Sequence, residues 1–151
     1  YVLETVAKLR EMGIKIGSTT GYTDIMMNVV VPKAKELGYA PDCWFSPDST
    51  DGMGRPYPYM IFENMKTLKV SSVENAIKVG DTVSDILEGK NAGLFTIGIL
   101  EGSSVLGLSQ EEYEALSETE RQEKLSQAEE KYKKAGADAV VRDIRGILDY
   151  I

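Results

Sequence analysis

Apolar residues recur along this chain at two different spacings. In the first segment they stand at positions 2, 3, 6, 7 and 9, a helical spacing that Gly13 is well suited to end. Further on, short runs rich in β-branched and aromatic residues alternate with longer amphipathic segments. This alternation predicts an α/β fold, in which a Rossmann-like parallel sheet carries helices on both faces.

The pattern places each expected element along the chain. Strands are expected at 14–18, 42–45, 76–79, 95–99 and 137–141. Helices are expected at 1–12, 23–37, 56–68, 82–92, 109–135 (as one or two) and 144–151. Pro32 should kink or restart the second of these helices. No linker or shift of composition divides the chain, so residues 1–151 are expected to form part of one domain.

Polar loops follow the first four expected strands, at 19–22, 46–55, 80–84 and 100–107. Because the carboxyl ends of parallel strands meet at one edge of a sheet, the polar residues of these loops should converge there. This expected convergence supports a functional site more strongly than any single motif does.

Composition narrows the classes of function. The net charge of −7 argues against a nucleic-acid partner, and no apolar run is long enough to span a membrane. The chain has no histidine, which excludes serine or cysteine centres that depend on one and histidine-ligated zinc. Its single cysteine, Cys43, is most simply explained by a reducing, cytoplasmic compartment.

The most informative segment is 80–85, with the sequence GDTVSD, which leaves a strand and opens a helix. Asp81 at the strand end offers the hard oxygen ligands that Mg²⁺ prefers, and Asp85 lies one turn further on as a supporting group. In a purely structural interpretation, Thr82 caps the helix and Asp85 is a favourable charge in its first turn. The strand context favours the metal interpretation.

Two other loops carry candidate anion ligands. The hydroxyl of Thr20 and the backbone of Gly21, with Tyr22 beside them, could hold phosphate oxygens, although ordinary turn and packing roles are the simpler explanation for these residues taken alone. Arg55 is constrained between a glycine and a proline, and its planar guanidinium suits a phosphoryl or phosphonyl group. The alternative for Arg55 is a solvated surface side chain.

Three segments together resemble motifs of the haloacid dehalogenase superfamily, and more narrowly those of the phosphonoacetaldehyde hydrolases, or phosphonatases. They are IGSTTGY at 16–22, GRPYP at 54–58 and KVGDTVSD at 78–85, and the GSS loop at 102–104 is also similar. The resemblance implies that Thr20 and Arg55 bind the phosphonyl group and that Asp81 binds Mg²⁺, supported by Thr82 and Asp85. The implied reaction splits phosphonoacetaldehyde into acetaldehyde and phosphate, using a Schiff-base lysine and an aspartate nucleophile.

The chain departs from that family in one large respect. The first motif, with the aspartate nucleophile, and the cap domain with the Schiff-base lysine have no counterpart here. We therefore expect 1–151 to be the C-terminal part of the core domain of a longer enzyme, a homodimer when whole, and to be inactive alone. The alternatives are another phosphatase or phosphomutase of the superfamily, a non-catalytic flavodoxin-like binding module, or a partial gene product without function.

Overall fold

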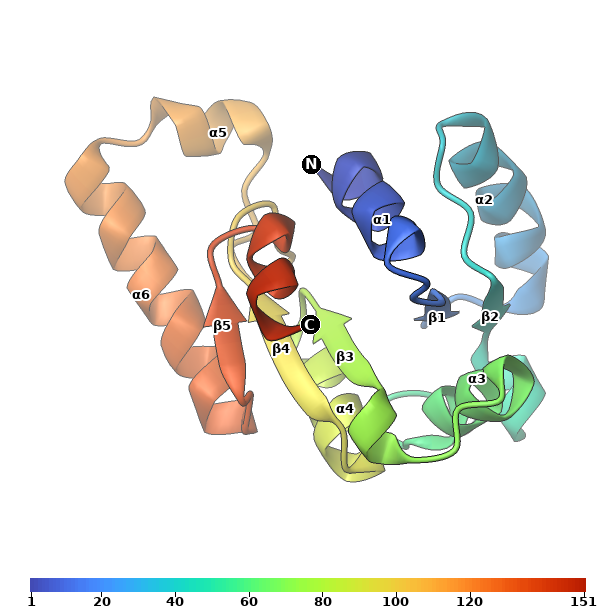
Figure 1. The fold of residues 1–151 in the computed structure, drawn as a ribbon. Coiled ribbons are helices and arrows are strands. Elements are labelled where there is room, and N and C mark those ends of the chain that lie inside the picture. The colour runs from blue at the N-terminus through green and yellow to red at the C-terminus, as the bar shows by residue number, and fades with distance from the viewer.

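The computed structural model describes residues 1–151 as an α/β fold (Figure 1). Its helices are α1 (Val2–Glu11), α2 (Asp24–Glu36), α3 (Tyr59–Leu68), α4 (Val83–Ala92), α5 (Gln110–Ala115) and α6 (Glu118–Ala135). Its strands are β1 (Gly17–Thr19), β2 (Cys43–Phe45), β3 (Ile77–Gly80), β4 (Phe95–Ile99) and β5 (Ala139–Val141). Short 3₁₀ helices are η1 (Pro47–Thr50), η2 (Val73–Asn75) and η3 (Ile144–Tyr150).

All strand pairs are parallel, as the alternating pattern predicts, but the strands form two sheets. One sheet pairs β1 with β2, and the other has the order β3-β4-β5. Strands β1 and β3 are each paired on one edge only, and Figure 1 shows them as the neighbouring strands of the two sheets. The other edge of each of these two strands therefore has no hydrogen-bonded neighbouring strand.

Helices cover both faces of the larger sheet, as expected. On one face, Leu9 of α1 and Ile147 of η3 pack on Ile97 of β4. On the other face, Ile86 of α4 packs with Tyr132 of α6. A smaller cluster joins α3 to the turn after α4. The two apolar layers hold the strand ends in place because burial of apolar surface is the dominant stabilising contribution.

Two glycines allow the helices to approach the larger sheet closely. A Cβ at Gly98 in β4 would lie 2.6 Å from the Tyr132 ring, so only a glycine leaves room for the aromatic side chain of α6. A Cβ at Gly89 in α4 would lie 2.8 Å from the Cβ of Lys78 and would also collide with the Thr96 hydroxyl. Helix α4 therefore rests directly on β3 and β4 at Gly89.

Some expected boundaries were wrong, for local reasons. The first strand was expected to begin at 14 but begins at Gly17, because the Ile16 amide binds the Asp42 carboxylate instead of a neighbouring strand. Pro32 does not restart α2, which runs unbroken through it on the surface, and the kink expected there stays a prediction. The C-terminal segment forms a 3₁₀ helix rather than an α-helix. No helix in the structure has the length and apolar character needed to cross a membrane.

Candidate functional site: a groove between the two sheets

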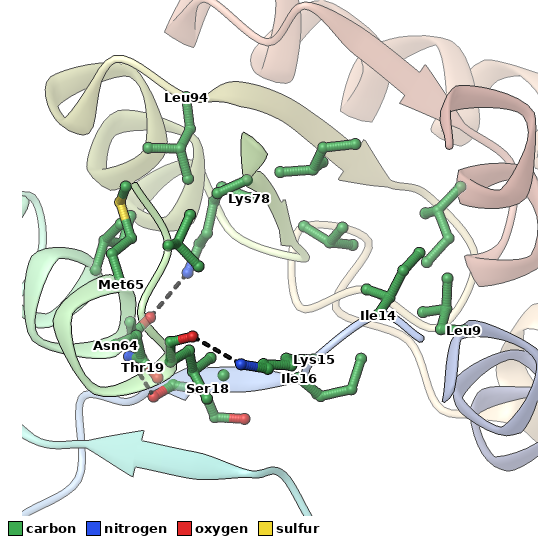
Figure 2. A pocket seen from close by; sticks show the side chains of 18 of the residues that line it. Leu9, Ile14, Lys15, Ile16, Ser18, Thr19, Asn64, Met65, Lys78 and Leu94 are labelled. Atoms are coloured by element: carbon green, nitrogen blue, oxygen red, sulfur yellow. Dashed lines mark hydrogen bonds between the residues drawn. The ribbon is translucent and has the colours of Figure 1, made fainter. Parts of the chain in front are cut away.

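The free edges of β1 and β3 border a groove of about 1020 Å³. Much of its wall is apolar, with side chains such as Leu9, Ile14 and Leu94 (Figure 2). At the carboxyl ends of the two strands the lining becomes polar and charged: Thr19, Arg55, Lys78, Asp81 and Asp85. Ligands of open α/β sheets bind at this edge, so the polar end of the groove is the candidate site.

Arg55 reaches this end of the groove from the loop before α3. Its NH1 donates to Asp85 Oδ1 at 2.7 Å, and the side chains are 19% and 7% exposed. This is the only hydrogen bond of the Arg55 side chain, although a guanidinium has five N–H donors. The remaining donors are therefore available to a ligand. The structure thus does not support the alternative of a solvated surface arginine.

Asp85 belongs to the start of α4, as the structural interpretation of the sequence predicts, and one of its oxygens faces two cations. Its Oδ2 accepts hydrogen bonds from the amide and the hydroxyl of Thr82, which completes a capping box at the start of α4. Its Oδ1 faces Lys78 as well as Arg55. Burial raises the pKa of Asp85, but the Lys78 ammonium, the Thr82 hydroxyl and Arg55 outweigh it, so the pKa lies below its ordinary value. Asp85 is thus held as a carboxylate.

Lys78 and Glu88 are site residues that the sequence did not reveal. The Lys78 ammonium lies 2.8 Å from the Thr19 hydroxyl, 2.7 Å from Glu88 Oε2 and 3.1 Å from Asp85 Oδ1 (Figure 2 shows the bond to Thr19). Glu88 is fully buried and also accepts from Thr19. A lysine inside the apolar run 76–79 was the one available signal.

Asp81 lines the same groove and is held from one side. Its Oδ2 accepts from both the amide and the hydroxyl of Ser104, at 3.0 and 2.7 Å, while Oδ1 makes no hydrogen bond. A carboxylate with one free oxygen at a strand end fits Mg²⁺. However, no group of three or more acidic, cysteine or histidine residues is placed to hold a metal. The chain therefore offers one carboxylate ligand, not a complete metal site.

Thr20, Gly21 and Tyr22 lie in the turn after β1 but are not among the residues that line the groove. The Thr20 hydroxyl accepts from the Tyr22 amide, and the Thr20 amide donates to the Phe45 carbonyl. Successive residues of a strand point to opposite faces, and it is the neighbouring Thr19 that faces Lys78. The binding role of this turn stays a prediction.

Comparison with known proteins agrees with this fold. The sequence model of the haloacid dehalogenase-like hydrolase family matches residues 1–93, and a HAD-hydrolase-like model matches 52–146. A phosphonoacetaldehyde hydrolase-like protein from Oleispira antarctica has a crystal structure with a TM-score of 0.90 and 36% identity. That superposition covers 97% of this chain and 53% of the other.

Curated relatives are phosphonoacetaldehyde hydrolases. The enzyme of Lysinibacillus sphaericus is 45% identical over 147 residues, which is 97% of this chain and 55% of that protein. A bifunctional phosphonoacetaldehyde hydrolase/aminoethylphosphonate transaminase of Clostridioides difficile is 46% identical over all 151 residues, or 24% of its own length. The chain thus spans about half the length of the single-function relative. Together with the parallel fold and the family match, these similarities show that the chain belongs to the haloacid dehalogenase-like hydrolase family.

Proposed function

We propose that this chain is part of a Mg²⁺-dependent hydrolase that cleaves the carbon–phosphorus bond of phosphonoacetaldehyde, giving acetaldehyde and phosphate. One observation carries the proposal: Arg55, with most of its donors uncommitted, lines the same groove as the one-sided carboxylate Asp81. A guanidinium and a metal-binding carboxylate are the groups needed to bind a dianionic phosphonyl group. The similarity to phosphonoacetaldehyde hydrolases supports the choice of substrate.

In this proposal each site residue has a distinct task. Arg55 binds the phosphonyl oxygens and offsets their charge during attack at phosphorus. Thr20 and Gly21 hold the same group from the turn after β1, and Tyr22 covers it. These residues orient the phosphonyl group and exclude water from it.

The metal would be held by Asp81, while Thr82 and Asp85 support the turn that carries it. When bound, Mg²⁺ neutralises the oxyanions of the phosphonyl group. Ser104 holds the second oxygen of Asp81 and so directs the free Oδ1 toward its ligand. The chain's own contribution is therefore an oriented carboxylate.

We infer that catalysis also needs residues outside 1–151. No residue here matches the aspartate nucleophile or the Schiff-base lysine of the resemblance; Asp24, for example, already accepts a hydrogen bond from Ser46. The single-function relative is almost twice as long as this chain. The groove has free strand edges on both sides, which an additional strand of the parent protein would pair. The whole protein is the enzyme, and 1–151 alone is inactive.

The test compares the parent protein with the 151-residue chain. Phosphate release from phosphonoacetaldehyde is measured for both, and for Arg55→Lys and Arg121→Lys variants of the parent. Arg121 lies on α6, away from the groove, and bonds to Glu118 of its own helix and to the carbonyls of Glu114 in α5 and Leu116 in the turn between the helices. We expect activity in the parent and in Arg121→Lys, a loss of about a hundredfold or more in Arg55→Lys, and no steady turnover by the chain alone.

Trapping distinguishes the proposal from its rivals within the superfamily. Borohydride should reduce a Schiff base between the parent protein and the aldehyde substrate, leaving a stable adduct. Hydrolysis of phosphate esters without an aldehyde-dependent adduct would point instead to a phosphatase or phosphomutase. If neither reaction occurs and Arg55→Ala leaves ligand binding unchanged, the chain is a binding module.

A further inference from the structure

The Arg55–Asp85 pair is unusual because it uses one hydrogen bond. Arginine and carboxylate groups commonly join through two parallel bonds, with both arms of the guanidinium on both oxygens. Here only NH1 binds Oδ1, and Oδ2 is occupied by the Thr82 hydroxyl at 2.6 Å and the Thr82 amide at 3.2 Å. The oxygen that a second arm would need is already engaged.

Lys78 restrains the other oxygen of the same carboxylate. Its ammonium lies 3.1 Å from Asp85 Oδ1, the atom that also accepts from Arg55. The ammonium also donates hydrogen bonds to Glu88 Oε2 and the Thr19 hydroxyl, so it has a partner in each of three residues. The Lys78 stem lies against Gly89 of α4, which limits its movement. Asp85 is thus confined by Thr82 on one oxygen and by Lys78 on the other.

The charges of this cluster balance. Lys78 and Arg55 face Asp85 and Glu88, so two cations meet two carboxylates in a largely buried site. Glu88 is fully buried, and its Oε1 has no hydrogen-bond partner. The Glu88 side chain therefore makes its contacts through Oε2, and the Lys78 ammonium is the only cation among them. Without Lys78, the Asp85 carboxylate would have Arg55 as its only cation, and Oδ1 would be free to accept from a second N–H of the guanidinium.

We propose that Lys78 is a positioning residue: with Glu88 it fixes the Asp85 carboxylate so that Arg55 is held by one arm and presents the rest of its guanidinium to the groove. The proposal rests on the proposed role of Arg55 in binding a phosphonyl group. In this proposal Lys78 does not bind the substrate, since its ammonium is already engaged by Asp85, Glu88 and Thr19. It acts by leaving the other N–H donors of Arg55 free to bind a ligand.

The geometry can be tested without any ligand, in the 151-residue chain. Labelled guanidinium groups are followed by NMR, and Arg55 is assigned with Arg55→Lys. In Lys78→Met, Asp85 Oδ1 loses its ammonium partner and can accept from a second N–H of Arg55, which should slow rotation about the Cζ–N bonds by about tenfold, the effect of one added charge-assisted bond. Unchanged Arg55 signals and rotation in a folded Lys78→Met chain would overturn the proposal.

A double variant protects the test against misfolding. Lys78→Met with Glu88→Leu removes a buried ion pair as a unit, a change that proteins often tolerate. It should show the same Arg55 change as the single variant, because both lack the ammonium. Lys90→Met is the matched control, since Lys90 pairs with Asp138 at the other end of α4. An Arg55 change in Lys90→Met, or none in the double variant, would contradict the proposal.

Kinetics of the parent protein then separate this proposal from the proposed function. If the enzyme hydrolyses phosphonoacetaldehyde, the double variant should lose about tenfold in kcat/KM, mostly through a higher KM, because a binding donor is diverted. If the parent protein does not hydrolyse it, the proposed function fails, while the Arg55 spectra still decide the role of Lys78. A kinetic loss without any change in the Arg55 spectra would overturn the positioning role alone.

Discussion

Asp85 connects more of the candidate site than any other side chain. One of its oxygens caps α4 through Thr82, and the other faces two cations, Lys78 and Arg55. It therefore joins the helix start, strand β3 and the loop before α3 in one network. Since the side chain is almost fully buried, each of these contacts acts with little screening by water.

Acid should weaken the fold through Asp85. Its pKa is lowered in the folded chain from an ordinary 3.8, so its carboxylate stabilises the fold above about pH 4, and this contribution is lost as the pH falls through the lowered value. Asp85→Asn should cost about 3 kcal/mol at pH 7, because two cations lose their partner. It should also flatten the dependence of unfolding free energy on pH below 4.

Urea unfolding between pH 2.5 and 7 measures both effects. Asp149→Asn is the control, because Asp149 is exposed and forms no ion pair. A pH profile of Asp85→Asn that runs parallel to the profile of the unmodified chain would show that Asp85 contributes nothing to acid sensitivity.

Ser104 should affect metal binding without touching the metal. Its hydroxyl donates to Asp81 Oδ2 at 2.7 Å, and residues that orient a ligand in this way typically contribute about tenfold or more to affinity. Ser104→Ala should therefore weaken Mg²⁺ binding to the parent protein by about tenfold, measured by calorimetry. Ser109→Ala removes a comparable hydroxyl, the cap of α5, and should leave the affinity unchanged. Equal affinities in both variants would exclude this role.

Site residues were predictable to different degrees. Arg55 and Asp81 follow expected strands, and the sequence alone predicts that their loops converge. Lys78 and Glu88 were not recognised, because glutamates on helices usually face water and a lone lysine in a strand has no obvious partner. Only the packing of α4 on β3 brings Lys78 and Glu88 together. No short sequence motif specifies how two such segments pack.

At the scale of elements, the helix caps follow local rules closely. Ser or Thr at the start and Asp or Glu three residues later form capping boxes at α4, α5 and α6, and Gly93 ends α4 in the left-handed conformation. Such contacts join near neighbours, so sequence predicts them well. The restart expected at Pro32 was wrong because α2 lies on the surface, where water can satisfy the carbonyl that loses its partner.

The capping boxes of α4 and α6 provide a matched pair of variants. Thr82→Ala and Ser117→Ala each remove a cap hydroxyl and should each destabilise the chain by about 1 kcal/mol in chemical unfolding. Only Thr82→Ala should also perturb the Arg55 guanidinium, because it frees Asp85 Oδ2. The same Arg55 spectrum in both variants would mean that the α4 cap has no influence on the site.

At the scale of the whole molecule, the chain folds as two parallel sheets with a groove between them. The alternating pattern correctly predicted parallel strands with helices on both faces. It did not predict the division, because the pattern along a strand does not specify which strand lies beside it. The register of β1 with β2 and of β3 with β4 emerges only from packing.

Hydrogen exchange should reveal the difference between the sheets. Strand β4 is paired on both edges and largely buried, whereas β1 is short and paired only with β2. Amides of β4 should exchange about a hundredfold more slowly than those of β1 in the 151-residue chain. In the parent protein β1 should become protected if a further strand fills the groove. Equal protection of β1 in both proteins would argue against that filling.

A substitution at Gly89, which no ligand would touch, should disturb the charged end of the groove. Even one methyl group there would press on the Lys78 stem and the Thr96 hydroxyl, forcing α4 outward or the lysine aside. Either response would transmit through Asp85 to Arg55. A small substitution at position 89, away from the substrate, should thus change the affinity of the protein for an anion.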